Sequence, residues 1–432
     1  MPQALVPIVK KEIEVALKLG IIEPVVNLKN PTAYASPTIL VKKKEVGKYR
    51  ICIDHRKLNL VTIPQRYRLP NASHLIERVA SAKILSLADL TKGYHQVKIC
   101  ETDQHKTGFL CLGRHYICKY LSFGLSGGPA TFQLLMDTVL AGMEEFALSF
   151  IDDIIIFSDN FEDHMKHLER VFQALQDANL TANPAKVTLC MPELKFLKHL
   201  VGGGKKSVDL EKTNILDQIK IPNSKRDIRK FLGFCGFYRT FIDGFSEIAA
   251  PLTDLLKKSS NELIPWNQEA NNSFHNLKNA LQKAPVLVAP DFNKTMVVMV
   301  DSSLIAVGGV LCQEYHGELL PIIFVGRKFS EPESRLSATE REVLGILSVF
   351  KKLRYYLVGK QFVLLTDVKA INYFKNNAST SAKLTRWLIL MSEYEYKVGH
   401  VPGKQFVVPD YLSRFVSYNM DTDALVEGIK IK

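Results

Sequence analysis

The most constraining feature of this sequence is a pair of adjacent aspartates inside an apolar run, Phe150-Ile-Asp152-Asp153-Ile-Ile-Ile-Phe157. A carboxylate buried alone is costly, and it normally becomes protonated or finds a cation. A tight turn between two strands places both aspartates at the tip of a hairpin, where they can reach a divalent ion. An acidic surface turn is the alternative for a bare Asp-Asp pair. We favour the metal site, because surface hairpins usually alternate polar and apolar residues.

Composition bounds the class of protein. A chain of 432 residues with 47% hydrophobic and 23% charged content is typical of a globular protein with two to four domains. The net charge of +12 favours a polyanionic partner, either nucleic acid or an anionic membrane surface. Because there is no run of 18 apolar residues and no apolar leader, we expect neither membrane spanning nor secretion. Scattered cysteines without a CxxC pair favour reduced intracellular thiols.

Further patterns in the first half support the same chemistry. Strands are expected at 38–41 and 49–53, with a lysine-rich turn between them that suits phosphate binding, although a solvated hairpin tip is the usual outcome for a charge run. A third apolar strand, 84–90, reaches Asp89 before a glycine-containing turn, which makes Asp89 the candidate third carboxylate. A helix over 129–140 fits between Asp89 and the Asp pair.

Two helices are expected after the Asp pair. The helix over 162–179 carries His164 and His167, a spacing that can bind zinc. We do not expect a zinc site, because no cysteine or second carboxylate cluster lies nearby at ligand spacing and both histidines can lie on the solvent face. A helix over 223–238 is followed by aromatic residues interleaved with basic ones, which suits either a nucleic-acid surface or the core of a small helical subdomain.

The second half repeats the pattern of separated carboxylates. A polar linker is expected at 258–265 and a helical connector at 266–290, followed by a strand over 295–300 that ends at Asp301 and a paired strand over 307–312. A helix over 337–353 carries Glu340 and Glu342, Asp367 follows a strand over 362–365, and Asp410 lies in a final helical segment. Carboxylates at the ends of four elements suggest a second two-metal site.

These motifs occur in a recognisable order. The chain carries Lys43, Arg50, Asp89-Leu-Thr-Lys-Gly-Tyr94, Phe123-Gly-Leu, Pro129-Ala-Thr-Phe-Gln133, Phe150-Ile-Asp152-Asp153, Asn183-Pro184, Phe196-Leu197, Phe231-Leu-Gly233 and Pro251-Leu252. This series resembles the reverse transcriptase of Ty3/gypsy-type long-terminal-repeat retrotransposons. Residues 339–342, 366–367 and 409–414 resemble the RNase H domain of the same family.

The resemblance implies a multidomain α+β and α/β fold, in which a right-hand polymerase precedes a connector and an RNase H-like domain. The expected boundaries are 1–205 for fingers and palm, 206–258 for a thumb-like helical segment, 259–292 for the connector, 293–415 for the RNase H-like domain and 416–432 for a tail. We expect the chain to be a piece of a larger polyprotein or a truncated genomic copy.

The resemblance also implies the residues of two catalytic sites that use Mg²⁺ or Mn²⁺. The metal ligands would be Asp89, Asp152 and Asp153 for polymerisation, and Asp301, Glu342, Asp367 and Asp410 for hybrid cleavage. We choose Glu342 over Glu340 because it precedes the apolar run as the active glutamate of the family does. The substrate contacts would be Lys43 and Arg50 at the triphosphate, Tyr94 at the sugar, and Phe123 and Gln133.

The implied function is RNA- and DNA-templated DNA polymerisation with cleavage of the RNA strand of RNA–DNA hybrids. The partners would be RNA or DNA template-primers, hybrids, deoxynucleoside triphosphates and other segments of a Gag-Pol polyprotein, with no membrane. We expect the protein inside the cell, in the cytoplasm or in virus-like particles, and leave a nuclear phase open. The alternative is a decayed or repurposed copy that binds nucleic acid without polymerase activity.

Several residues depart from the family pattern. Phe150 replaces a tyrosine, Lys198 stands where the family has a glycine, and Phe406 and Pro409 replace an asparagine and an alanine. A glycine at this position indicates either a positive φ or a close approach of the backbone to the primer, and a side chain there is strained if that geometry is kept. The retained carboxylates favour an active enzyme, whereas the changes at Lys198, Phe406 and Pro409 favour decay.

Overall fold

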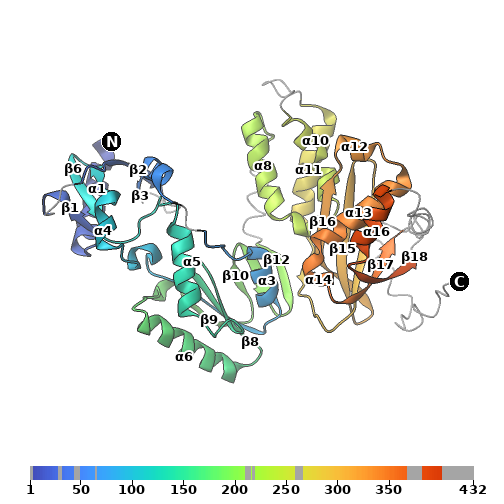
Figure 1. Ribbon diagram of the computed structural model, residues 1–432, viewed down its shortest axis with the longest axis horizontal. Helices are drawn as coiled ribbons and strands as arrows, with labels where there is room; N and C mark the ends of the chain where they lie inside the picture. The colour runs from blue at the N-terminus through green and yellow to red at the C-terminus, as the bar shows by residue number, and fades with distance from the viewer. Residues whose placement is uncertain are drawn as a thin grey trace. The chain divides into compact units, whose positions relative to one another are not determined.

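The computed structural model describes residues 3–27, 32–42, 49–63, 66–209, 216, 219–257, 266–366 and 382–400 (Figure 1). The chain divides into two compact units. The first comprises residues 1–75 and 82–194, and the second comprises residues 76–81 and 195–432. None of the helices in the described part of the chain is long and apolar enough to cross a membrane.

The first unit begins with helix α1 (Val6–Lys18), whose apolar face packs on a five-stranded sheet. The sheet order is β1-β6-β5-β2-β3. Its strands are β1 (Ile22–Pro24), β6 (Arg114–Cys118), β5 (Phe109–Cys111), β2 (Ser36–Lys42) and β3 (Tyr49–Ile53). β2 and β3 pair in antiparallel fashion with Val41 opposite Arg50, which confirms the predicted hairpin. The unit also contains the short helices α2 (Arg56–Val61) and α4 (Glu101–Gln104), while α3 (Ala72–Ala80) begins in the first unit and its residues from Ile76 on belong to the second.

The second sheet of the first unit carries the Asp pair. Its order is β7-β8-β4-β9, and all neighbours are antiparallel. The strands are β7 (Ala147–Phe150), β8 (Asp153–Ser158), β4 (Ile84–Asp89) and β9 (Thr188–Met191). Helices α5 (Gly128–Val139) and α6 (Phe161–Asp177) bury their apolar faces against this sheet. The predicted hairpin, strand and two helices are therefore confirmed to within a few residues.

The interpretation that both histidines of α6 can lie on the solvent face was wrong for His164. Its side chain is fully buried and lies between two serines, with Nε2 2.7 Å from Ser86 Oγ and Nδ1 2.8 Å from Ser158 Oγ. His167 Nδ1 also lies 2.8 Å from Ser158 Oγ. The histidines satisfy buried serine hydroxyls on neighbouring strands, and only the tertiary packing brings these residues together.

The second unit contains a small sheet and a group of helices before its large sheet. The small sheet has the order β10-β11-β12-β13, with strands β10 (Leu194–Phe196), β11 (His199–Gly202), β12 (Lys205–Val208) and β13 (Leu287–Val288). The helices are α8 (Lys225–Phe237), α9 (Phe245–Ile248), α10 (Ala250–Asp254) and α11 (Gln268–Gln282). The connector predicted to be helical over 266–290 is helical only as far as Gln282. Its last part instead contains β13, which pairs with β12.

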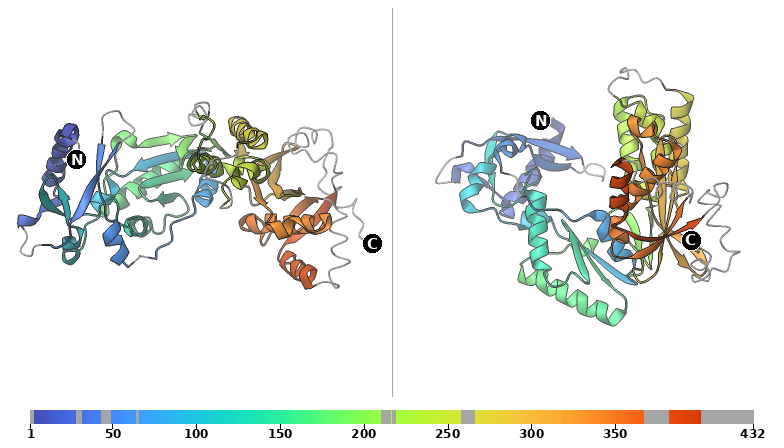
Figure 2. Two further views of the ribbon diagram at one scale, coloured as in Figure 1. Left: turned by 90° about the horizontal axis from the view of Figure 1, so that it is seen from above. Right: turned by 45° about the vertical axis from the view of Figure 1, so that its right-hand side comes forward.

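The large sheet of the second unit has the order β16-β15-β14-β17-β18. Its strands are β14 (Met296–Ser302), β15 (Ala306–Tyr315), β16 (Glu318–Lys328), β17 (Gln361–Thr366) and β18 (Glu395–His400). Helices α13 (Ala338–Lys352) and α16 (Ala382–Met391) pack on one face, and α8 and α11 contribute to the core on the other (Figures 1 and 2). Two short helices, α12 (Glu331–Ser334) and α14 (Arg354–Leu357), flank α13.

In the second half of the chain, the predicted strands and helix are present, but the strands end at different residues from those predicted. The strand predicted to end at Asp301 continues through Ser302, so Asp301 lies within β14. The strands at 307–312 and 362–365 and the helix at 337–353 are confirmed as β15, β17 and α13. The predicted linker at 258–265 and the final helical segment around Asp410 lie outside the described residues.

Lys198 has a positive φ, which is one of the two backbone requirements that the glycine of the family indicates. Together with Leu197 it forms the turn between β10 and β11, and the two residues have φ of +68° and +45°. A side chain in this left-handed region costs about 1–2 kcal/mol. The ammonium of Lys198 lies 5.2 Å from the centre of the Phe237 ring, so a cation–π contact offsets part of that cost.

Comparing glycine with alanine at position 198 separates the strain from the ring contact. Both substitutions remove the cation–π contact, but only glycine relieves the positive φ. We expect Lys198→Gly to be more stable than Lys198→Ala by about 1 kcal/mol, after allowing for the greater freedom of glycine in the unfolded chain. Urea unfolding followed by tryptophan fluorescence measures the difference. Equal midpoints for the two variants would show that the turn is not strained.

Candidate active sites

The first site lies at one end of the β7-β8-β4-β9 sheet. A two-residue turn, Ile151 and Asp152, joins β7 to β8, and Ile151 has φ of +57°. Left-handed residues are typical of such short hairpin turns. Asp153 is the first residue of β8 and pairs with Asp89, the last residue of β4. The three carboxylates predicted from the sequence therefore come from one end of two neighbouring central strands.

The charges of these carboxylates interact. Partial burial, followed by the charges of Asp152 and Asp89, raises the pKa of Asp153 to about 6, while Lys186 acts in the opposite direction. Like charges held together in this way favour the binding of a cation. The carboxylates thus have the electrostatic character expected of a metal site.

Lys186 is a member of this site that sequence reasoning did not identify. Its ammonium donates to both oxygens of Asp89, at 3.0 and 2.9 Å. It follows Asn183, whose backbone N–H donates to the Asp89 carbonyl at 2.8 Å and so fixes this segment beside β4. A lysine 97 residues away in the chain carries no local signal of this contact.

Carboxylate oxygens are the ligands that Mg²⁺ prefers, so the chemistry of the donor set fits such an ion. Among the residues that the structure describes, no group of three or more acidic, histidine or cysteine side chains is arranged to hold a metal. In this arrangement Lys186 supplies the positive charge that compensates Asp89.

Gln133 connects helix α5 to the turn that carries Asp152. Its side chain is fully buried, and its Oε1 accepts a hydrogen bond of 2.8 Å from the backbone N–H of Ile151. Its Nε2 donates to Asp137 Oδ1 at 2.7 Å and to Ser149 Oγ at 2.9 Å. A direct contact with substrate, as the resemblance implies, would require the amide to leave these bonds. The contacts favour a role in holding the turn in its left-handed conformation.

The two roles of Gln133 predict different kinetics. We expect Gln133→Met to lower the rate of nucleotide incorporation by about 10- to 100-fold, because a displacement of about 1 Å at a reacting centre can cost a hundredfold. If Gln133 acts through the turn, kcat falls while KM for the nucleotide changes little. A raised KM with unchanged kcat would instead support the substrate contact. Gln173→Met, on the exposed side of α6, is the matched control.

The predicted sugar-pocket residue Tyr94 lies beside the Asp pair. Its ring contacts those of Phe123 and Phe132, with centroids 5.1 and 5.5 Å away. A Cβ on the preceding Gly93 would lie 3.4 Å from Asp152 Cβ and 3.0 Å from the Phe132 ring, so this segment runs close to the turn. Burial, and then the charge of Asp152, raises the pKa of Tyr94. Tyr94 and Phe123 are thus brought together near the carboxylates.

The two predicted triphosphate contacts are not seen in full. Lys43 lies outside the described residues, and for Arg50 only the backbone in β3 is described. Their role at the triphosphate remains a prediction.

The second set of carboxylates is described for two of its four members. Asp301 lies in β14, and Glu342 lies on α13, while Asp367 and Asp410 fall outside the described residues. A Cβ at Gly345 would lie 2.1 Å from Ser302 Oγ, so Ser302 faces α13. Alternation along the strand turns Asp301 to the opposite face of the sheet. Glu342 lies three residues before Gly345, in the first half of α13.

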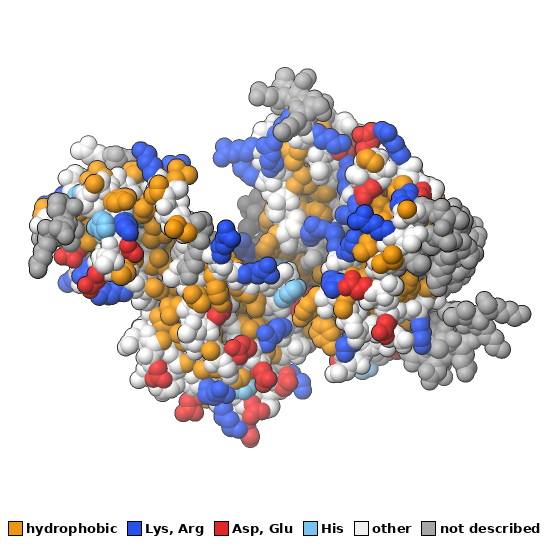
Figure 3. All heavy atoms as spheres, viewed as in Figure 1, with side chains coloured by type: hydrophobic (Ala, Val, Ile, Leu, Met, Phe, Trp, Pro, Cys, Tyr) orange, Lys and Arg blue, Asp and Glu red, His pale blue; other side chains and the backbone are white. Residues whose placement is uncertain are grey.

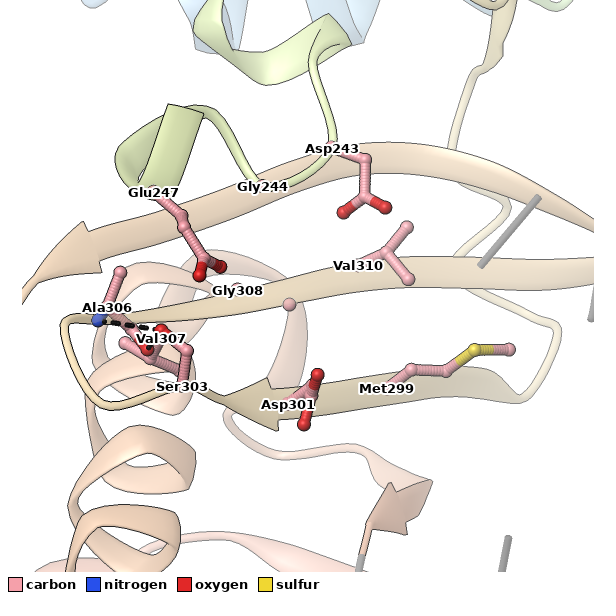
Figure 4. Close-up of a pocket in the computed structure, with 11 residues that line it drawn as sticks. Asp243, Gly244, Glu247, Met299, Asp301, Ser303, Ala306, Val307, Gly308 and Val310 are labelled. Carbon is pink, nitrogen blue, oxygen red and sulfur yellow. Dashed lines mark hydrogen bonds between the residues drawn. The ribbon is translucent and has the colours of Figure 1, made fainter. Parts of the chain in front are cut away.

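Asp301 opens onto a pocket of about 160 Å³ on its face of the sheet. Figure 4 shows Asp243 and Glu247, from the segment around α9, projecting toward β15, with Glu247 above Gly308 and Asp243 above Val310. Burial, opposed by a backbone hydrogen bond from Gly244 and reinforced by the charge of Asp301, raises the pKa of Asp243. Asp243 and Glu247 had no sequence signal, because their approach to Asp301 depends on how α9 packs on the sheet.

Glu340, the alternative to Glu342, has a structural role. Its carboxylate accepts from the backbone N–H of Ser337 at 3.1 Å, which forms the capping box at the start of α13. It also pairs with Lys383 of α16. The Lys383 hydrogen bond, with those from Ser337, lowers the pKa of Glu340 despite partial burial. These contacts agree with the choice of Glu342 as the metal ligand, which itself remains a prediction.

Comparison with known families matches both halves of the chain. The family described as reverse transcriptase (RNA-dependent DNA polymerase) matches residues 41–234. The family described as RNase H-like domain found in reverse transcriptase matches residues 266–364.

Solved structures show the same fold. The foamy viral protease-reverse transcriptase dRH in complex with double-stranded DNA has a TM-score of 0.82, with 20% identity over 91% of this chain and 69% of that chain. The foamy viral protein in complex with an RNA/DNA hybrid has a TM-score of 0.76, with 21% identity over 94% of this chain and 55% of that chain. The protein is therefore built as a reverse transcriptase fold followed by an RNase H-like domain.

Relatives place the chain in a family. It is 36% identical over 411 residues to the Pol polyprotein of transposon 297 from Drosophila melanogaster, covering 94% of this chain and 38% of that protein. It is 34% identical over 423 residues to that of transposon gypsy from the same organism, covering 94% of this chain and 40% of that protein. The chain belongs to the reverse transcriptase and RNase H-like region of Gypsy/Ty3-type retrotransposon Pol polyproteins. It spans about two-fifths of the length of these two relatives.

Proposed function

We propose that this chain synthesises DNA on RNA and DNA templates and cleaves the RNA strand of RNA–DNA hybrids. The observation that carries the proposal is the meeting of Asp89, Asp152 and Asp153 at a turn braced by Gln133. The family membership and the duplexes bound by the foamy viral proteins support it. Other segments of a Gag-Pol polyprotein are the proposed partners, and a virus-like particle or the cytoplasm is the proposed location.

The proposed polymerase site holds Mg²⁺ or Mn²⁺ through Asp89, Asp152 and Asp153. When bound, two such ions activate the attacking 3′-hydroxyl and neutralise charge on the leaving pyrophosphate. Two other residues hold the carboxylates of this site in position. Gln133 fixes the turn, and Lys186 holds the Asp89 carboxylate in place. The proposed subdomain boundaries remain those expected from the sequence.

Tyr94 is the proposed discriminator between sugars. Its ring is held by Phe123 and Phe132 at the side of the carboxylates, where a ribose 2′-hydroxyl would collide with it. This arrangement favours deoxynucleotides as substrates. Lys43 and Arg50 are the proposed contacts to the triphosphate, since a fixed guanidinium and a flexible ammonium both suit phosphate oxygens.

A primed incorporation assay tests the polymerase half of the proposal. The parent chain is expected to extend a DNA primer on homopolymeric RNA and DNA templates when magnesium or manganese is supplied. A chain that binds the template-primer but extends it with neither ion would support the alternative, a decayed or repurposed copy that only binds nucleic acid.

The two glutamates of α13 test the cleavage half. We expect Glu342→Gln to stop metal-dependent cleavage of a labelled RNA–DNA hybrid, because removing one ligand charge misplaces the ion. Glu340→Gln should retain cleavage and lower stability by at most about 1 kcal/mol, since glutamine keeps the capping-box hydrogen bond and only the ion pair with Lys383 is lost. If the Glu340 variant is the one that loses cleavage, the ligand on α13 has been chosen wrongly.

A further inference from the structure

A pair of cations at the edge of the large sheet lies outside both sites described above. The carbonyl oxygen of Gly326, in the edge strand β16, accepts a hydrogen bond of 3.0 Å from the Arg239 guanidinium and another from the Lys352 ammonium. Arg239 follows α8, and Lys352 is the last residue of α13. The two cations therefore approach one carbonyl from different elements of the second unit.

Neither cation has a carboxylate to balance it. In the described part of the chain, Arg239 and Lys352 form no ion pair, whereas their neighbour Arg327 is paired with Glu333 through two bonds of 2.7 and 2.8 Å. Lys352 is an exposed residue, but burial of its ammonium and then the charges of Arg239 and Arg327 lower the pKa of Lys352 to about 8. An anion placed at this pair would relieve the repulsion.

The pair lies in the same row of the sheet as Asp301. Asp301 pairs with Gly308, and Gly308 pairs with Gly326. Two strand spacings separate Asp301 from Gly326, which is about 10 Å. A Cβ on Gly326 would lie 3.4 Å from Ser246 Oγ, so Gly326 and Asp301 face the same side of the sheet. Basic side chains also gather on the visible face of this unit (Figure 3).

We propose that Arg239 and Lys352 form a binding site for a backbone phosphate of the RNA–DNA hybrid, about 10 Å from Asp301. The proposal rests on the proposed function, because it assigns a contact to the hybrid-cleaving domain. A guanidinium and an ammonium that both remain accessible to solvent suit phosphate oxygens, and such contacts position a duplex without reading its sequence. The site anchors the strand while the carboxylates act on a neighbouring phosphate.

The experiment measures hybrid binding as a function of salt, in a chelator so that no cleavage occurs. Each phosphate contact contributes a slope of about −0.9 to the dependence of log affinity on log salt. We expect Arg239→Ala with Lys352→Ala to flatten the slope by about 1, as the loss of one phosphate contact requires, and to weaken binding about tenfold at moderate salt. Lys351→Ala removes an exposed lysine from the same helix and is the matched control. The charge-retaining Arg239→Lys with Lys352→Arg should restore most of the slope.

Other outcomes overturn the proposal in distinguishable ways. An unchanged slope in the double alanine variant, together with a lower unfolding midpoint, would mean that the two cations only satisfy the Gly326 carbonyl. If Lys351→Ala reduces the salt slope as much as the double alanine variant does, hybrid binding depends on the overall positive charge of the region and not on a specific phosphate site. A parent chain that does not bind the hybrid at all would defeat both this proposal and the proposed function.

Discussion

Replacing Asp152 with asparagine is expected to abolish nucleotide incorporation while leaving hybrid cleavage intact. The side chain projects from a turn that is fixed by the left-handed Ile151 and by Gln133, so the substitution changes one charge in a rigid setting. Two-ion sites supply several kcal/mol of transition-state stabilisation, and loss of a ligand charge misplaces the ions. At about 1.4 kcal/mol per factor of ten, we expect a loss of about a thousandfold or more.

Primer extension and hybrid cleavage are measured on the same preparation of the Asp152→Asn variant. Asp159→Asn is the matched control, because Asp159 is exposed just beyond the opposite end of β8, about 20 Å along the strand. The control should extend primers at the parent rate. Retained incorporation in Asp152→Asn would exclude Asp152 as a ligand. Loss of both activities in a folded variant would contradict two separate sites.

The largest expected effect on stability comes from a buried ion pair in the second unit. Lys206, in β12, contacts Glu77, near the end of α3, and each side chain is only 4% exposed. Burial lowers the pKa of Lys206, although Glu77 acts the other way. Burial, and then the charge of Glu77, raises the pKa of Tyr356 in α14. One buried carboxylate therefore interacts with groups from two other elements of the unit.

Removing the Glu77 carboxylate leaves the buried Lys206 ammonium without that counter-charge. We expect Glu77→Ala to lower the free energy of unfolding by about 3–5 kcal/mol, because the Lys206 ammonium loses its only close counter-charge in the described residues. Replacing both partners together, Glu77→Leu with Lys206→Met, should cost far less or nothing, since neither charge then remains buried.

The unfolding measurement for this pair is specific to the second unit. The chain has two tryptophans, Trp266 and Trp387, and both lie in that unit, so urea unfolding followed by their fluorescence reports on it alone. If the double variant is as unstable as Glu77→Ala, the loss of unfolding free energy comes from altered packing and not from the unpaired charge of Lys206.

Local sequence determined the elements that carry the first site. The apolar run around Asp152 and Asp153 predicted a hairpin because strands alternate their side chains and only a turn lets two adjacent carboxylates leave the core. The same reasoning found β4 ending at Asp89 and helix α5 before the hairpin. The glycine of the family at position 198 indicated either a positive φ or a close backbone approach, and the structure shows the positive φ. Such features depend on a few neighbouring residues.

Tertiary structure alone decided which distant residues complete these sites. Lys186 binds Asp89, and His164 is buried beside two serines of neighbouring strands. The sequence around each of these residues is the same as would be expected for a side chain exposed to solvent. The packing of α13 on Ser302 shows which face of the sheet carries Asp301. The two cations at the Gly326 carbonyl, Arg239 and Lys352, are brought together only because the ends of two helices meet there. A sequence records the period and polarity of each element, but contacts between elements are set by how whole faces pack, and their partners are many residues away.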